Sequence, residues 1–288
     1  VYGVLRLINF VHSELFMLGA YVCFALLAVL VGDVGAAGAL AITVAFFAVF
    51  AIVGSIGVTI ERVAYKPLRA ATRLAPMLSA LGLSLAFQAA VQLLAGPQPI
   101  QFPRIFPSIR FDLAGAVLNS TQIGIVVLAV ILMLLLTAFV GRTRLGVVVR
   151  AVSESPRTAA LLGINVDHAI SLIFFIGPGL GALGGILYAS YYGIMFPSMG
   201  TIVGLKAFTA AILGGIGSIP GAMLGGFLLG LLEVTGTALL PIITHGVLGT
   251  DYRDVFTFVV LVLVLIFRPA GLLGEQVSEE TAVYKRDY

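Results

Sequence analysis

Charged side chains are scarce in this sequence. Only 10% of its 288 residues are Asp, Glu, Lys or Arg, while 60% are hydrophobic and the mean hydropathy is +1.14. Soluble domains carry about 25% charged and about 45 to 50% apolar residues. The composition therefore excludes a water-soluble enzyme and a disordered chain, and it indicates a protein whose solvent is the lipid bilayer.

Long stretches of the chain contain no charge at all: residues 74–103, 113–141 and 168–205. Each stretch exceeds the about 20 apolar residues that cross a hydrocarbon core of about 30 Å. We therefore expect an all-α, polytopic transmembrane protein, a single domain over residues 1–288 with about eight spans. Val1 is not a methionine and an apolar segment follows it at once, so we expect the first helix to be incomplete.

Several chemical sites lack the residues that they need. Cys23 is the single cysteine and cannot form an intrachain disulfide, and His12, His168 and His245 are scattered without other ligands nearby. The glycine-rich residues 214–221 lack the lysine of a phosphate-binding loop. No nucleophile stands beside a base. We therefore expect no metal, no cofactor, no catalytic residue and no ATP site in this chain.

Basic residues are concentrated in two short segments. Residues 61–73 and 142–167 hold eight of the sixteen Lys and Arg. Basic residues near the ends of membrane helices mark the cytoplasmic side, which predicts that both segments face the cytoplasm. Residues 96–118, with four prolines, are then the large external loop. No basic patch is interleaved with aromatic residues, so nucleic acid is not an expected partner.

Glycine is abundant, with 34 residues, and its spacing is regular. Intervals of four recur at Gly177, Gly181 and Gly185 and again at Gly217, Gly221 and Gly225. Small residues at this spacing lie on one helix face and let backbones approach closely in lipid. This predicts tightly packed helices; alternatively, the glycine faces let helices slide during transport. We expect a broken or re-entrant segment near residues 204–221.

The cytoplasmic segment at about 141–168 predicts a short helix outside the membrane. Ser155 is a suitable N-cap, Pro156 suits the first helical position and Gly163 suits the end. The residues between them are Arg157, Thr158, Ala159, Ala160, Leu161 and Leu162. A two-turn helix is unstable by itself in water, so it needs a partner surface. That surface is either the membrane interface or a cytoplasmic subunit that moves the helix.

Three ionisable residues lie within or beside otherwise uncharged spans: Glu14, Lys206 and Glu233. A charge at the bilayer centre is costly and by default suggests function. We therefore consider these residues candidates for the translocation path, together with the break at Gly214, Gly215 and Gly217. The alternative is that the charged residues tie helices together.

Five segments closely resemble the LivH-type permease subunit of branched-chain amino acid ABC transporters: INFVHSE at 8–14, MLGAY at 17–21, ERVAYKPLR at 61–69, GLKAF at 204–208 and LGGIGSIPGAMLGG at 213–226. The resemblance covers nearly the whole chain. It implies a multi-pass subunit of the bacterial inner membrane that imports leucine, isoleucine, valine or related small solutes by ATP-driven alternating access. The implied partners are a second, LivM-like permease subunit, two cytoplasmic ATP-binding subunits and a periplasmic substrate-binding protein.

The chain departs from the family pattern at two places. Ser13 stands where the family usually has glycine. The coupling motif of ABC permeases survives only as Ala159, Gly163 and Ile173, so residues 153–165 are assigned as the coupling element on their capping pattern as much as on the motif. Relatives with the same motifs carry urea or short amides. An ion-coupled carrier or channel is the alternative of a different class.

Overall fold

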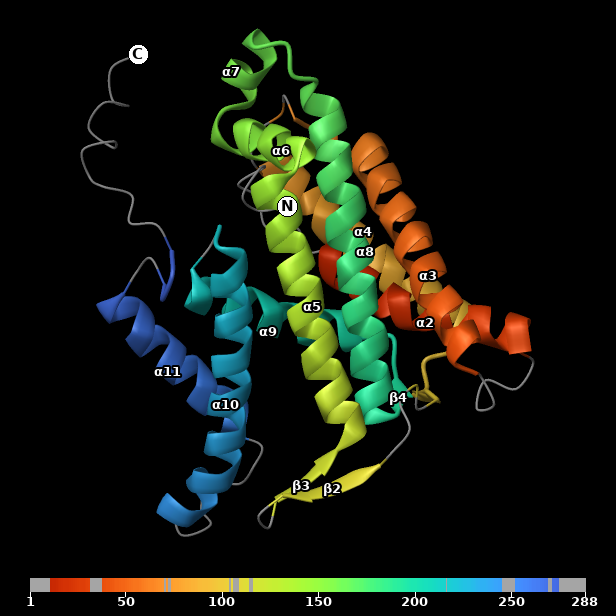
Figure 1. Cartoon of the computed structure of the whole chain (residues 1–288), viewed down its shortest axis with the longest axis vertical. Coiled ribbons are helices and arrows are strands. Elements are labelled where there is room, and N and C mark those ends of the chain that lie inside the picture. Colours follow the sequence, from red (N-terminus) through yellow and green to blue (C-terminus); the bar gives the residue numbers. More distant parts are fainter. Residues whose placement is uncertain are drawn as a thin grey trace. The chain divides into compact units, whose positions relative to one another are not determined.

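The computed structural model describes residues 11–31, 38–69, 71, 74–103, 105, 109–113, 116–215, 217–244, 252–268 and 271–274. The chain divides into two compact units, unit 1 (Val1–Leu205) and unit 2 (Lys206–Tyr288). Helices dominate the described part of both units, in agreement with the expected all-α permease fold (Figure 1).

Six described helices are long and apolar enough to cross a membrane: α2 (Val11–Val31), α3 (Ala39–Ile60), α4 (Leu74–Ala95), α5 (Ser120–Arg142), α8 (Val166–Tyr192) and α10 (Ile219–Ile243). Two further helices are shorter, α9 (Met199–Gly214) and α11 (Arg253–Phe267). The structure therefore bears out a polytopic helical protein, and the expected count of eight spans is approximate. The predicted incomplete first helix falls on residues outside those that the structure describes.

The core of unit 1 forms where α8 packs along both α2 and α3. Glycines make these close approaches possible: a Cβ at Gly185 would collide with the Phe16 carbonyl, and one at Gly19 would collide with the backbone of Ala182. On the α3 side, Gly57 lies against the Phe174 carbonyl. The predicted tight packing of glycine-spaced helices is therefore present between α2, α3 and α8, as expected where lipid offers no hydrophobic drive for helix association.

The predicted external loop at 96–118 contains short strands that the sequence did not indicate. Strand β2 (Arg110–Leu113) pairs antiparallel with β3 (Ala116–Asn119), and β1 (Ile100–Gln101) pairs antiparallel with β4 (Ile194–Met195). Asn119 then caps α5, because its backbone N–H donates to the Gln122 side chain in a capping box. The hairpin thus passes directly into the membrane helix.

The opposite end of unit 1 carries two short helices, α6 (Arg144–Glu154) and α7 (Pro156–Leu161) (Figure 1). The chain turns sharply between α5 and α6, where Gly146 lies against the carbonyls of Phe139 and Val140. Sequence analysis predicted α7 but not α6 as a separate helix. A π-helix, η2 (Glu61–Tyr65), continues α3.

Unit 2 contains the predicted break. The residues after Gly214 form a turn in which Gly215 and Gly217 have φ angles of +106° and +101°, a region that side chains with a Cβ rarely adopt. Beyond the turn, α10 packs closely on the end of α9, with Gly225 against the Ala210 carbonyl. The short helix before the break begins at Met199, directly after a turn at Pro197 and Ser198 and five residues earlier than expected.

Candidate functional site

Helix α7 has the predicted capping geometry. The Ser155 hydroxyl accepts a hydrogen bond from the Thr158 backbone N–H at 3.2 Å, and Pro156 occupies the first turn. Gly163 ends the segment with a φ of +79°. These contacts fix the ends of a helix that is too short to be stable by propensity alone.

Two large apolar side chains, on the last residue of α7 and on its C-cap, are exposed within unit 1. Leu161 is 83% exposed and Leu162 is 75% exposed, whereas Ala159 on the same helix is buried. Both leucines lie outside the long apolar helices. Arg157 and Ala160 are also exposed, and Ser155 is half-buried.

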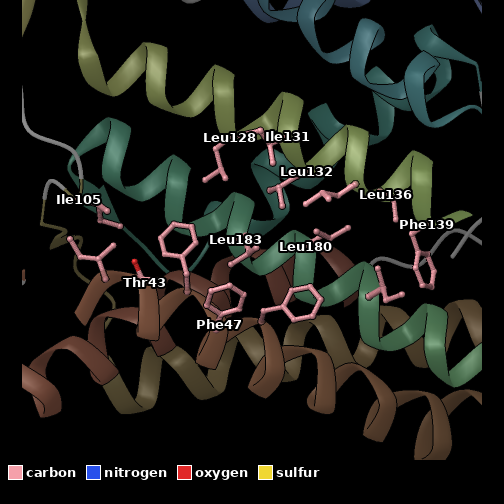
Figure 2. A pocket seen from close by; sticks show the side chains of 15 residues that line it. Thr43, Phe47, Ile105, Leu128, Ile131, Leu132, Leu136, Phe139, Leu180 and Leu183 are labelled. Carbon is pink, nitrogen blue, oxygen red and sulfur yellow. The ribbon is translucent and has the colours of Figure 1, made fainter. Parts of the chain in front are cut away.

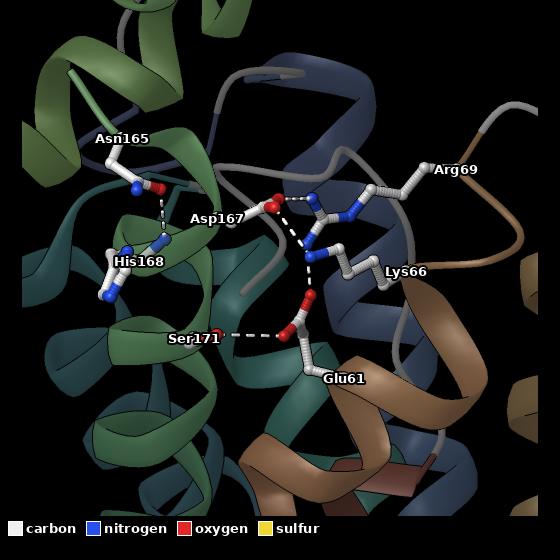
Figure 3. Close-up of polar contacts among 7 residues, drawn as sticks. All are labelled: Glu61, Lys66, Arg69, Asn165, Asp167, His168 and Ser171. Carbon is white, nitrogen blue, oxygen red and sulfur yellow. Dashed lines mark hydrogen bonds and ion pairs between the residues drawn. The ribbon is translucent and has the colours of Figure 1, made fainter. Parts of the chain in front are cut away.

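A network of polar side chains lies at the start of α8, three residues beyond the turn that ends α7 (Figure 3). Arg69 donates to Asp167 at 2.6 Å and also pairs with Glu61. Lys66 Nζ lies 2.7 Å from the second oxygen of Asp167, and the Ser171 hydroxyl donates to Glu61 at 3.0 Å. We call these five residues the charge network; it joins the segment that follows α3 to the first turns of α8.

Glu14 is buried in the helical core of unit 1, where it is only 1% exposed. Its Oε1 accepts hydrogen bonds from Thr201 on α9 at 2.8 Å and from Ser84 on α4 at 3.1 Å. Its Oε2 is buried without a hydrogen-bond partner and lies against Gly200. The carboxyl group therefore joins α2, α4 and α9 and keeps one oxygen available as an acceptor.

Lys206 and Glu233 are brought together by the structure. The Lys206 Nζ lies 2.8 Å from Glu233 Oε1, and each side chain is about one quarter exposed. This ion pair connects α9 to α10 within unit 2.

The glycine break between α9 and α10 is closed by backbone contacts. Leu272 and Leu273 donate backbone hydrogen bonds to the carbonyls of Leu213 and Gly214 at 3.0 Å and 2.9 Å. Gly215 also lies against the backbone of Gly274. The glycines at 214 and 215 therefore admit neighbouring backbone rather than present an open surface.

A groove of about 620 Å³ lies between α3, α5 and α8 (Figure 2). Its lining is apolar apart from the Thr43 hydroxyl and comprises Ile42, Thr43, Phe46, Phe47, Phe50, Ile105, Leu128, Ile131, Leu132, Leu135, Leu136, Phe139, Ile176, Leu180 and Leu183. Burying a charged group without partners costs many kcal/mol. The groove therefore suits hydrocarbon and does not suit a charged or zwitterionic solute.

Comparison with known proteins identifies the family. The profile of the branched-chain amino acid transport system / permease component family matches residues 1–265. The chain belongs to this family. The permease is 41% identical to the high-affinity branched-chain amino acid transport system permease protein BraD of Pseudomonas aeruginosa, over 97% of the chain and 90% of the relative.

Other relatives agree with this assignment. The permease is 39% identical to LivH of Escherichia coli K12, with the same coverage, and 27% identical to a probable LivH of Methanocaldococcus jannaschii, over 92% of the chain and 82% of the relative. No solved structure matches the chain. The permease is accordingly a multi-pass inner-membrane protein, and its relatives are transport subunits, not enzymes.

Sequence reasoning missed the contacts that join Arg69 to Glu61 and Asp167. The segment ERVAYKPLR carried the family resemblance, yet its charges were assigned only to a basic loop. The acid at position 167 lies two residues after the N-cap Asn165, whose side chain accepts from the His168 N–H. An acidic residue at this position, close to a basic segment, was the signal in the sequence that Lys66 and Arg69 could pair with the start of α8. Among the described residues, no cluster of three His, Cys, Asp or Glu side chains could hold a metal.

Proposed function

We propose that this permease imports branched-chain amino acids, leucine, isoleucine and valine, across the inner membrane by ATP-driven alternating access. Its relatives in Pseudomonas aeruginosa and Escherichia coli carry that substrate class in their names. In this proposal the chain pairs with a second, LivM-like permease subunit. A periplasmic binding protein delivers the substrate, and two cytoplasmic subunits bind and hydrolyse ATP, so this chain needs no cofactor.

The observation that carries the proposal is the exposed leucine pair on α7. A capped helix that presents Leu161 and Leu162 outside its own fold supports docking into a partner that can move it. The basic residues of the adjoining segments favour a cytoplasmic location for this end of unit 1. Closure of the ATP-binding subunits would then displace α7 and, through it, α8.

The decisive experiment changes both leucines to aspartate in the full complex. The Leu161→Asp/Leu162→Asp variant should lose binding of the ATP-binding subunits in detergent pull-down, because two charges replace apolar contact area. Leu145→Asp, a change at an exposed leucine on α6, is the matched control and should leave binding intact. Normal assembly of the double variant would refute the coupling assignment, and import by the purified chain under an ion gradient without ATPase subunits would instead support a secondary carrier.

For the translocation path we propose Glu14 as the principal polar group. Its free oxygen supports a role as acceptor for the substrate ammonium once α9 moves away from α2. The contacts of the other predicted path residues favour structural roles. The Lys206 and Glu233 pair supports a tie between α9 and α10, and Gly214, Gly215 and Gly217 support a compact turn between those helices.

A competition experiment distinguishes a branched-chain amino acid importer from an importer of urea or short amides. Proteoliposomes containing the permease, its ATPases and the accompanying binding protein should take up labelled leucine, and excess valine should compete. Excess urea or acetamide should not compete. The reverse pattern would transfer the proposal to an amide importer.

A further inference from the structure

One guanidinium group contacts two carboxylates from different parts of unit 1. Arg69 donates through Nη1 to Asp167, 98 residues away in sequence, and pairs through Nη2 with Glu61. The guanidinium fork is planar and places its donors in fixed directions, so this bridge sets orientation as well as distance. Lysine, which carries a single point of charge, cannot form the same bridge.

The Asp167 side of the bridge is connected directly to α7. Only residues 162–165 separate the end of α7 from the start of α8. This connection is internally bonded, because Ile164 N–H donates to the Ala159 carbonyl at 3.0 Å and Asn165 caps α8. A displacement of α7 is therefore transferred to the first turn of α8, where Asp167 lies.

The Glu61 side of the bridge directly follows α3. Glu61 is 1% exposed, and its second oxygen accepts from Ser171, one turn further along α8 than Asp167. It begins the π-helix η2, a form that is rare and frequently found at functional sites. Removing the guanidinium would leave a buried carboxylate short of a charged partner.

We propose that Arg69 is a positioning residue that couples the motion of α7 to α3 by holding Glu61 and Asp167 together. With the bridge intact, α8 and the end of α3 move as one body when α7 is pushed. Without it, the first turn of α8 moves with α7 while η2, which directly follows α3, lags behind. This inference rests on the proposed function of α7 as the contact for the ATP-binding subunits.

The test measures substrate molecules imported per ATP hydrolysed by the complete transporter in proteoliposomes. Arg69→Gln and Asp167→Asn should lower this ratio by roughly 5-fold or more, the lower end of typical coupling between sites. Binding of the ATP-binding subunits should be unchanged. Arg62→Gln is the matched control, since Arg62 is exposed on η2 next to Glu61 and lies outside the charge network.

Conservative variants separate this role from a structural one. Asp167→Glu keeps the charge at the start of α8 and should restore most of the ratio, whereas Arg69→Lys keeps the charge but not the fork and should stay uncoupled. A wild-type ratio in Asp167→Asn or Arg69→Lys would overturn the inference. The inference would also be overturned if these variants lowered the amount of assembled transporter but left the number of substrate molecules imported per ATP hydrolysed unchanged. Failure of the wild-type chain to bind the ATPases would instead refute the proposed function of α7.

Discussion

Lys206 and Glu233 form an ion pair, with Nζ 2.8 Å from Oε1, between two helices that are otherwise almost wholly apolar. Each charge alone would be costly in a membrane helix, and each is compensated by the other. The sequence suggested two separate polar residues on the translocation path. The structure instead pairs Lys206 with Glu233, so their opposite charges compensate each other.

The pair should behave as a pair under mutation. Lys206→Met or Glu233→Leu alone leaves one uncompensated charge and should lower the thermal unfolding temperature in detergent, while the double variant should recover much of the loss. A double-mutant cycle should give an interaction free energy of about 0.5 to 3 kcal/mol. Strictly additive single effects would contradict the tie.

The contact between α2 and α8 should be sensitive to one methyl group. Gly185→Ala places a Cβ against the Phe16 carbonyl and must push the helices apart, so we expect a loss of about 1 to 3 kcal/mol in unfolding free energy. Gly82→Ala is the control, because a Cβ there meets nothing within 4 Å and alanine is the better helix former. Denaturation monitored by circular dichroism compares the two; equal stability would show that the interface yields freely.

The cap of α7 should matter for coupling more than for folding. Ser155→Ala removes the acceptor for the Thr158 N–H, which typically costs about 1 kcal/mol of helix stability. We expect weaker binding of the ATP-binding subunits by up to about 5-fold, measured by titration, since part of the binding energy must then order the helix. Ser155→Asp keeps a capping oxygen and should bind as the wild type does.

The Glu14 carboxyl group should be required for transport. Glu14→Gln keeps an oxygen for the Ser84 and Thr201 hydroxyls, so the complex should assemble. Losing a charged hydrogen bond to the substrate should nevertheless lower the initial rate of leucine uptake by about tenfold or more. Ser84→Ala removes one hydroxyl and keeps the carboxylate, and should have a much smaller effect. Unimpaired uptake by Glu14→Gln would remove this residue from the path.

The sequence predicted local structure correctly where a residue type has a specific structural preference, such as a helix cap or a glycine at positive φ. Ser155, Pro156 and Gly163 predicted α7 with its correct start, because capping and helix termination depend on neighbouring residues only. The glycines at 214–217 predicted a break, since positive φ angles strongly favour glycine.

The sequence by itself determined that this is a polytopic helical membrane protein and where α7 begins, because hydropathy and capping act over a few residues. Only the tertiary structure decided which charges meet: Lys206 with Glu233, and Arg69 with both Glu61 and Asp167. Such pairing depends on helix packing between segments up to about a hundred residues apart, which no local pattern encodes. The tertiary structure also distinguishes Glu14, a buried carboxyl group with one oxygen that has no hydrogen-bond partner, from Lys206 and Glu233, which pair with each other.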